Sequence, residues 1–271
     1  MFLADYHLHT YISQDGHETM PDMAGAAAKA GMSQICVTDH CDMVGWRDGK
    51  PTDRDRAVIA AVISDWEDMM KNSPPPITVR RGIELGEAHL FPEQAVKFAA
   101  LPGLDFVIGS LHILREEGDF YAIPYKSNEQ CYALFDKYLD QSMEIAKLDF
   151  FDVMGHLGYG SRYMIHSDCD AKLDLFRYHD KIEALLRMLI QNGRGIELNV
   201  SGARDGVGFF PNDPILRLYR ELGGEIITVG SDAHFTANAG QDVAAGYERL
   251  RGIGFGYVTV FKDRKPEFIK I

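Results

Sequence analysis

Residues 2–10 read FLADYHLHT, an apolar and aromatic run that is typical of a buried β-strand and ends in two histidines. Side chains alternate along an extended chain, so His7 and His9 are expected on the same side, where both can bind one metal ion. Taken alone, the pair is equally well explained by one hydrogen-bonded core histidine and one exposed histidine. The interpretation therefore depends on whether the pattern recurs in the chain.

The same transition from an apolar run to a metal-binding side chain does recur. The runs that end in this way include QICVTD, ITVRRGI, DFVIGSL, FFDVM and EIITVGS. Six of the ten histidines, two aspartates and one glutamate follow predicted strands: His7, His9, Asp15, His40, Glu84, His112, His156, Asp232 and His234. The C-terminal ends of strands converge on one face of an α/β barrel, so these residues are predicted to form one metal site there.

Predicted strands alternate with predicted helices along the whole sequence. Strands are expected near residues 2–7, 34–38, 77–83, 105–110, 151–155, 195–199, 226–230 and 256–261. Helices are expected near residues 21–31, 53–71, 92–100, 127–147, 174–192, 212–222 and 239–251. This order predicts an α/β fold with a parallel sheet covered by helices, closed or nearly closed. No linker divides the chain, so one domain over residues 1–271 is expected.

Composition and charge restrict the class of partner. A formal net charge of -12 argues against a general nucleic-acid surface, which needs clustered lysines and arginines. The four cysteines form no CxxC pair and are too few for a disulfide scaffold, so a reducing compartment is expected. No segment approaches the roughly 18 apolar residues of a membrane span, and Met1 leads into the first strand without a charged leader. A cytoplasmic protein without a membrane partner is expected.

The ligand set indicates more than one ion. Nine nitrogen and oxygen ligands exceed the three that a catalytic zinc takes from a protein, so two to three divalent ions are expected. Imidazoles and carboxylates without thiolates suit Zn, Mn or Fe. Glu84 ends an apolar strand, where a buried carboxylate needs a compensating cation, and it is therefore a natural bridging ligand. His40, His112 and His156 would each be explained singly as loop or core histidines, and the joint pattern favours metal.

The order His-x-His, Asp, His, Glu, His, His, Asp-x-His resembles the polymerase and histidinol phosphatase (PHP) superfamily. Within this superfamily, the sequence is most similar to the stand-alone histidinol-phosphate phosphatases. The segments that carry this similarity are DYHLHTYISQDG, TDHCD, GHLGYGSRY and ELNVSGAR. The resemblance spans His7 to His234 and implies a distorted (β/α)7 barrel with a trinuclear centre at the C-terminal ends of the strands. It also implies Asp15 as a ligand where several other members have histidine, with His17 as the alternative.

The resemblance further implies how the ligands divide among three ions. The first ion would be held by His7, His9, Glu84 and Asp232. Glu84 would bridge to a second ion, which is also held by His112 and His156. The third ion would be held by Asp15, His40 and His234.

Two arginines follow the fifth and sixth predicted strands, Arg162 in GYGSRY and Arg204 in NVSGAR. A guanidinium group can clamp two phosphate oxygens at once. As isolated residues both would be more simply explained as surface ion-pair arginines. Their place after strands, and the family's phosphate-binding positions to which they correspond, favour a phosphate site.

Other side chains near these loops are candidates for catalysis or for the walls of the pocket. Asp232 and His234 are expected near the leaving oxygen, and either can act as general acid while bound to metal. His17 and His89 are candidates for contacting the substrate, although each is equally well explained as a solvent-exposed loop histidine. Tyr159 and Tyr163 are candidates for the pocket wall, and simple packing is the alternative.

Adjacent divalent ions lower the pKa of a shared water and neutralise charge on a phosphoryl group during in-line attack. The expected activity is therefore release of phosphate from a small phosphomonoester, and the resemblance implies L-histidinol phosphate. Three alternatives stay open. They are another PHP hydrolase acting on a nucleotide or sugar phosphate or a phosphodiester, a non-catalytic metal-binding regulatory barrel, and an amidohydrolase-type metal barrel. The oligomeric state is not predicted.

Overall fold

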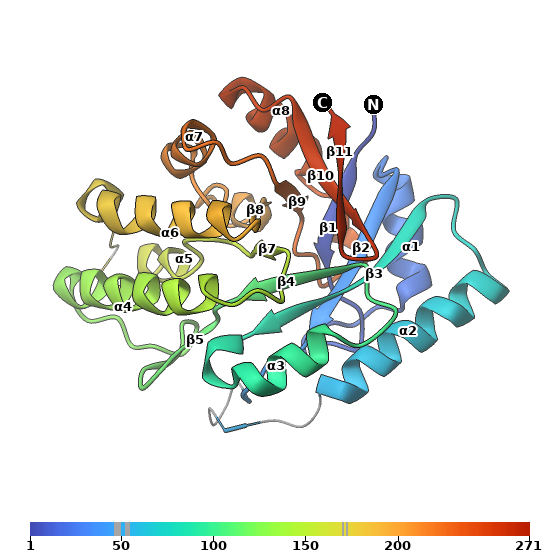
Figure 1. The fold of residues 1–271 in the computed structure, drawn as a ribbon, viewed down its shortest axis with the longest axis horizontal. Coiled ribbons are helices and arrows are strands. Elements are labelled where there is room, and N and C mark those ends of the chain that lie inside the picture. Colours follow the sequence, from blue (N-terminus) through green and yellow to red (C-terminus); the bar gives the residue numbers. More distant parts are fainter. Residues whose placement is uncertain (46–49, 52–54, 170, 172) are drawn as a thin grey trace.

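Seven parallel strands form the central sheet of the computed structural model, which describes residues 1–45, 50–51, 55–169, 171 and 173–271 (Figure 1). In sheet order they are β1 (Ala4–Leu8), β2 (Gln34–His40), β3 (Thr78–Gly86), β4 (Phe106–Ser110), β7 (Val153–Met154), β8 (Gly195–Asn199) and β9 (Ile227–Gly230). Neighbouring strands pair in parallel throughout. A parallel bridge between Leu8 and Ala233 joins the two edges, so the sheet is nearly closed as a barrel.

Helices connect the strands and lie around the outside of the sheet (Figure 1). They are α1 (Met20–Lys29), α2 (Asp55–Asn72), α3 (Pro92–Ala99), α4 (Asn128–Ala146), α5 (Ser161–Ile165), α6 (His179–Gln191), α7 (Asp213–Glu221) and α8 (Val243–Ile253). Their starts follow ordinary capping chemistry. Thr19 accepts a hydrogen bond from the backbone of Asp22, and Asn212 accepts one from the backbone of Ile215.

The core has two parts because successive strand residues face opposite sides of the sheet. The larger part packs the outward faces of the strands against the helices. The smaller part fills the barrel with Tyr6, Phe106 and Phe261 and their neighbours. The ring of Phe106 lies 5.1 Å from that of Tyr6 and 4.9 Å from that of Phe261. This apolar plug leaves the opposite, C-terminal end of the barrel for polar side chains.

The eighth predicted strand, near residues 256–261, does not extend the barrel. It forms β10 (Tyr257–Lys262), which pairs antiparallel with β11 (Lys265–Lys270) as a separate hairpin (Figure 1), and β10 contacts β9. The prediction of continued strand–helix alternation was wrong here because the bridge between Leu8 and Ala233 brings the two edges of the sheet together and leaves no room for another strand between them. Phe261 instead packs under the barrel and exchanges two hydrogen bonds with the Tyr6 hydroxyl, at 2.8 and 3.0 Å.

Smaller differences lie in the connections. Residues 175–178 of the helix predicted at 174–192 form a 3₁₀ turn before α6, and the helix predicted at 239–251 begins only at residue 243. Residues 53–54 of another predicted helix lie outside the described residues. A short hairpin of β5 (Ile113–Leu114) and β6 (Gly118–Asp119) was not predicted. None of the helices in the described part of the chain could cross a membrane, and the expected cytoplasmic location stays a prediction.

Candidate metal centre

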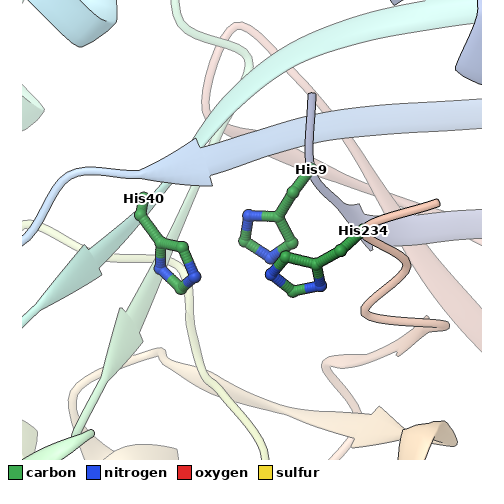
Figure 2. A group of neighbouring side chains, drawn as sticks. All are labelled: His9, His40 and His234. Atoms are coloured by element: carbon green, nitrogen blue, oxygen red, sulfur yellow. The ribbon is translucent and has the colours of Figure 1, made fainter. Parts of the chain in front are cut away.

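The predicted ligands lie together at the C-terminal ends of the strands. His9 follows β1, His40 ends β2 and His234 follows β9, and Figure 2 shows their rings meeting in one space. The His9 ring stacks on the rings of His40 and His234 at centroid distances of 4.3 and 4.1 Å. One nitrogen from each of the three lies within 4.8 Å of the others. Segments that are far apart in sequence thus present ligands to one point.

A second group consists of His7, His9, Glu84 and Asp232. His7 Nε2 lies 3.3 Å from Glu84 Oε2 and 3.8 Å from Asp232 Oδ1. His9 Nε2 lies 3.6 Å from that glutamate oxygen and 3.4 Å from that aspartate oxygen. Two ligands that are each about 2.0–2.1 Å from a tetrahedral ion lie about 3.3–3.4 Å apart. The spacing in this group therefore fits an ion between its members.

Glu84 also faces a third group through its other oxygen. Its Oε1 lies 3.1 Å from His112 Nε2 and 2.8 Å from His156 Nε2, and the two nitrogens are 3.2 Å apart. One carboxylate oxygen thus points to His7 and His9, and the other points to His112 and His156. This is the arrangement that a bridging carboxylate needs.

Asp15 completes the arrangement next to His40 and His234. Its Oδ2 lies 3.2 Å from His234 Nε2, and its Oδ1 lies 3.7 Å from His40 Nε2. His17 instead stacks its ring on that of Phe235, at 4.7 Å. The geometry thus favours Asp15 over His17 as a ligand.

Several of the converging atoms lack any other role. Four that are buried have no hydrogen-bond partner among the described residues: His7 Nε2, His9 Nε2, Glu84 Oε2 and His234 Nε2. A buried polar atom without a partner is costly, and such atoms are uncommon in folded proteins. Divalent ions would satisfy all four at once, so the residues present are able to hold metal.

Glu197, at the centre of β8, fixes the orientation of two of these histidines. Its Oε1 accepts a hydrogen bond from His7 Nδ1 at 2.7 Å, and its Oε2 accepts one from the backbone N–H of His156 at 2.7 Å. Because Nδ1 of His7 carries the proton in this bond, Nε2 presents its lone pair to the cluster.

Ser13 performs the same task for His9. His9 Nδ1 lies 3.1 Å from Ser13 Oγ, which itself donates to Asp39 Oδ1 at 2.7 Å. The backbone N–H of His40 also donates to this hydroxyl, at 3.0 Å. Since the hydroxyl proton is used in the bond to Asp39, His9 Nδ1 must act as donor. Its Nε2 is then the ligand atom, as in His7.

Two carboxylates lie behind His112. Asp42 Oδ1 is 3.6 Å from His112 Nδ1, and Glu87 Oε1 accepts hydrogen bonds from the backbone N–H groups of His112 and Ile113 at 2.7 and 3.0 Å. Burial raises the pKa of Glu87 to about 8. These contacts hold His112 from the side away from Glu84, so its Nε2 faces the cluster.

Imidazoles and carboxylates balance each other's charge in the cluster. Burial lowers the pKa of His7, but the carboxylates of Glu197 and Glu84 outweigh burial and raise it well above the usual value. Burial raises the pKa of Glu84, but the surrounding imidazoles, first that of His7, hold it well below its usual range. Burial and the nearby His234 lower the pKa of His9. Cations bound here would replace the protons that now balance the carboxylates.

Two of the candidate ligands have a left-handed backbone. The φ angles of His156 and Asp232 are 22° and 53°, a region that non-glycine residues seldom adopt. The Glu197 carboxylate holds the backbone N–H of His156, and the backbone N–H of Asp232 donates to the carbonyl of His7 at 2.6 Å. Such strain often accompanies functional sites, where the surrounding contacts enforce it.

Both predicted arginines border the cluster. Arg162 in α5 donates to Ser201 Oγ at 2.5 Å. Arg204 donates to the carbonyl oxygens of Ser231 and Asp232 at 2.8 and 3.1 Å. These bonds hold the two guanidinium groups at the rim, where both line the cavity over the cluster.

This cavity has a volume of about 490 Å³. Its walls combine seven candidate ligands with the two arginines, three tyrosines and Asp119: Asp15, His40, Glu84, His112, Asp119, Tyr121, His156, Tyr159, Arg162, Tyr163, Arg204, Asp232 and His234. Tyr159 and Tyr163 thus wall it, as predicted. His89 bonds to Gln141 of α4 at 3.1 Å, and neither His89 nor His17 is among the described residues that line the cavity. Their positions do not support the predicted substrate contacts.

Some residues of the site had not been predicted. Glu197 is an acid inside an apolar strand, which is the signal that identified Glu84, so the sequence contained the means to find it. Ser13 and Asp39 carry no such signal because their role depends on the folding of the loop after β1. Asp119 reaches the cavity only through the β5–β6 hairpin, which the sequence did not predict.

Comparison with known proteins agrees with this geometry. A model of the PHP domain family matches residues 5–201. A probable histidinol-phosphatase of Thermotoga maritima is 26% identical over 263 residues, which are 95% of each chain. The histidinol-phosphatase of Lactococcus lactis is 24% identical over 267 residues, which are 96% of this chain and 95% of the relative.

The fold also resembles a solved structure. The crystal structure of the histidinol phosphate phosphatase from Lactococcus lactis, complexed with Zn, L-histidinol and phosphate, matches with a TM-score of 0.79 at 22% identity, over 98% of both chains. The resemblance read from the histidine and aspartate motifs is thereby confirmed, because the family match covers most of the chain. This chain belongs to the PHP domain family.

Proposed function

We propose that this chain is a metal-dependent phosphomonoesterase that releases inorganic phosphate from L-histidinol phosphate. One observation carries the proposal: Arg162 and Arg204 line the same cavity as the cluster of imidazoles and carboxylates. Guanidinium groups and candidate metal ligands that line one cavity suit a phosphate group. The names of the relatives support L-histidinol phosphate as the ester.

The proposal includes two to three divalent ions, Zn, Mn or Fe. His7, His9, Glu84 and Asp232 would hold one ion, Glu84 with His112 and His156 a second, and Asp15 with His40 and His234 a third. The orphaned, buried Nε2 atoms of His7, His9 and His234 support this assignment. The zinc in the Lactococcus lactis structure supports zinc as one of the metals.

When bound, such ions supply a hydroxide nucleophile near neutral pH and neutralise phosphoryl charge. Arg162 and Arg204 bind the non-bridging phosphate oxygens and orient the ester for in-line attack. Either Asp232 or His234, which both line the cavity, delivers the one proton that the leaving oxygen needs. Tyr159 stands beside His156, with ring centroids 4.8 Å apart, and limits the access of solvent to this side.

The test is phosphate release from L-histidinol phosphate by Zn- or Mn-loaded protein, compared with a panel of sugar and nucleotide phosphates. Glu84→Gln is expected to lower turnover by at least about 1,000-fold and to lower the metal content, because it removes the bridging charge. Glu183→Gln, on the exposed side of α6, is the matched control and should behave as wild type.

The other functions appear as separate outcomes of the same test. Faster turnover of a sugar or nucleotide phosphate would keep the phosphoesterase and reject the histidinol assignment. Bound metal with no turnover of any ester would favour a metal-binding regulatory barrel.

A further inference from the structure

The cavity is lined by two unlike groups of residues. The first group, the candidate metal ligands and both arginines, suits an anionic phosphate. The second group contains Asp119 and Tyr121 from the β5–β6 hairpin. Neither residue belongs to the metal cluster or to the arginine pair, so neither has a role in the proposed chemistry.

The hairpin holds Asp119 in a fixed position. Ile113 pairs with Asp119 across its two short strands. The next residue, Phe120, is fully buried between Tyr138 and Tyr159, at ring distances of 5.7 and 6.2 Å, and its backbone N–H donates to the carbonyl of His112 at 3.2 Å. The hairpin is thus anchored directly to a segment that carries a candidate metal ligand.

The Asp119 carboxylate is half-buried, and the imidazoles of His112 and His40 only partly offset the effect of its burial on its pKa. Its Oδ1 accepts a hydrogen bond from the backbone N–H of Tyr121 at 2.8 Å. Within the described part of the chain, no lysine, arginine or histidine forms an ion pair with it. Burial raises the pKa of Asp119 because it disfavours the charged form. A positively charged ligand would offset that cost.

Tyrosine rings lead from this carboxylate to the metal cluster. Tyr121 is 79% exposed at the mouth of the cavity, and its ring lies 6.0 Å from that of Tyr163. The ring of Tyr163 lies 5.3 Å from that of Tyr159, which in turn lies 4.8 Å from His156. Tyrosine faces bind flat heteroaromatic rings and organic cations.

We propose that Asp119, Tyr121 and Tyr163 form a subsite for the non-phosphate end of the substrate. Asp119 binds an ammonium group, and the two tyrosines pack against a flat ring. The subsite selects a zwitterionic ester, with its anionic end at the arginines and its cationic end at the hairpin, and disfavours sugar and nucleotide phosphates, which carry no such ammonium. This inference rests on the proposed function, because it names what recognises the amine and imidazole of histidinol phosphate.

The test compares two esters in Asp119→Asn, which keeps an acceptor for the Tyr121 N–H and removes only the charge. We expect kcat/KM for L-histidinol phosphate to fall by about 10- to 100-fold, mainly through KM, since this is the usual effect of losing a hydrogen bond to a charged group. For phenyl phosphate, which lacks an ammonium group, kcat/KM should change by less than about threefold. Calorimetry should show weaker binding of L-histidinol and unchanged metal content.

Glu117→Gln is the matched control. Glu117 lies in the same hairpin, pairs with Lys137 on the surface and does not line the cavity, so this variant loses the same charge and should retain wild-type kinetics with both esters. Equal losses on the two esters in Asp119→Asn, or no loss on either, would overturn the subsite while leaving the phosphatase intact. A wild-type protein that does not hydrolyse L-histidinol phosphate overturns the proposed function, and the subsite with it.

Discussion

At the scale of single residues, Glu197 orients two candidate ligands without being one of them. Its two oxygens serve His7 Nδ1 and the backbone N–H of His156, and Asn199 Nδ2 approaches both oxygens at 3.4 and 3.3 Å. Three donors therefore share one carboxylate. A glutamine has only one acceptor oxygen and would turn a donor towards His7 or His156.

Glu197→Gln is accordingly expected to weaken metal binding by about 10- to 100-fold, the usual effect of losing an outer partner of a ligating histidine. If the new amide N–H faces His7 Nδ1, the imidazole must protonate on Nε2, which then cannot bind metal. Metal content after dialysis against a competing chelator measures the effect. Glu225→Gln, at an exposed glutamate before β9, is the control. A variant that retains wild-type metal content would contradict this role of Glu197.

A second prediction concerns Arg162. Its replacement by alanine removes a charged hydrogen-bond donor from the phosphate side of the cavity, and kcat/KM for L-histidinol phosphate should fall by about 100-fold. The metal content should stay unchanged because Arg162 contacts Ser201 and Asp205 rather than a candidate ligand. Arg187→Ala, at an exposed arginine of α6, is the matched control. Unchanged kcat/KM with bound metal would show that Arg162 does not bind the phosphate group.

The nine candidate ligands that converge in the structure were all predicted from the sequence. Most of them follow an apolar run, and that signal is local, whereas the choice of Asp15 over His17 came from the family resemblance. The partners that orient them could be predicted only in part. Glu197 shares the signal of Glu84, but the hydrogen bond from Ser13 to Asp39 joins segments whose closeness depends on loop geometry. The same limit applies to Asp119, whose position depends on an unpredicted hairpin.

At the scale of the elements, the approach of β9 to β1 and β8 decides whether the site forms. Gly230 ends β9, where an added Cβ would lie 2.2 Å from Glu197 Oε1 and 2.4 Å from His7 Cβ. The pairing of β1 with β2 is also irregular between Asp5 and Leu8. This irregularity lets both Tyr6 and His7 face the barrel interior, although strict alternation would separate them.

Gly230→Ala is expected to destabilise the protein by at least about 2 kcal/mol, because overpacking at a rigid contact forces backbone or side-chain shifts. It should also release metal, since the atoms displaced belong to His7 and Glu197. Urea denaturation and metal analysis measure the two effects. Gly252→Ala in α8, where nothing lies within 4 Å of the added Cβ, should be neutral or slightly stabilising. Equal stability of the two variants would show that β9 can move away.

Strand existence and order were largely predictable, whereas the partner of the last strand was not. Residues 257–262 have the apolar character of a barrel strand, and hydropathy cannot distinguish a barrel strand from a hairpin strand. The difference arises from the bridge between Leu8 and Ala233, which joins the two edges of the sheet.

At the scale of the whole molecule, the barrel separates an apolar end from a charged end. Tyr6, Phe106 and Phe261 fill one end, and the carboxylates and imidazoles gather at the other. The C-terminal hairpin contributes Val260 and Phe261 to the apolar plug, which supports the interpretation of residues 1–271 as one domain. That interpretation stays a prediction. Without ions, the charged end depends on bound protons for its balance, and the stability of the molecule should therefore depend on pH.

The sign of that dependence follows from His40. Burial lowers the pKa of His40, but the carboxylates of Glu84 and Asp42 raise it more, to about 9. An unfolded histidine titrates near pH 6.5, at about the unperturbed value, so between about pH 6.5 and 9 the folded metal-free protein binds more protons than the unfolded chain. The stabilisation from the His40 proton is complete below this window and is lost as the pH rises through it.

The Tm of chelator-treated protein should therefore fall from pH 6.5 to pH 9, and His40→Asn should flatten this slope. Metal-loaded protein should have a higher Tm at each pH, and its advantage should grow with pH because ions compete less with protons for the ligands. Scanning calorimetry of both forms at pH 6.5, 7.5 and 9 measures the two slopes. A metal-free Tm that rises through this window would mean that the cluster is not balanced by bound protons, and that the histidines face the ion sites already neutral.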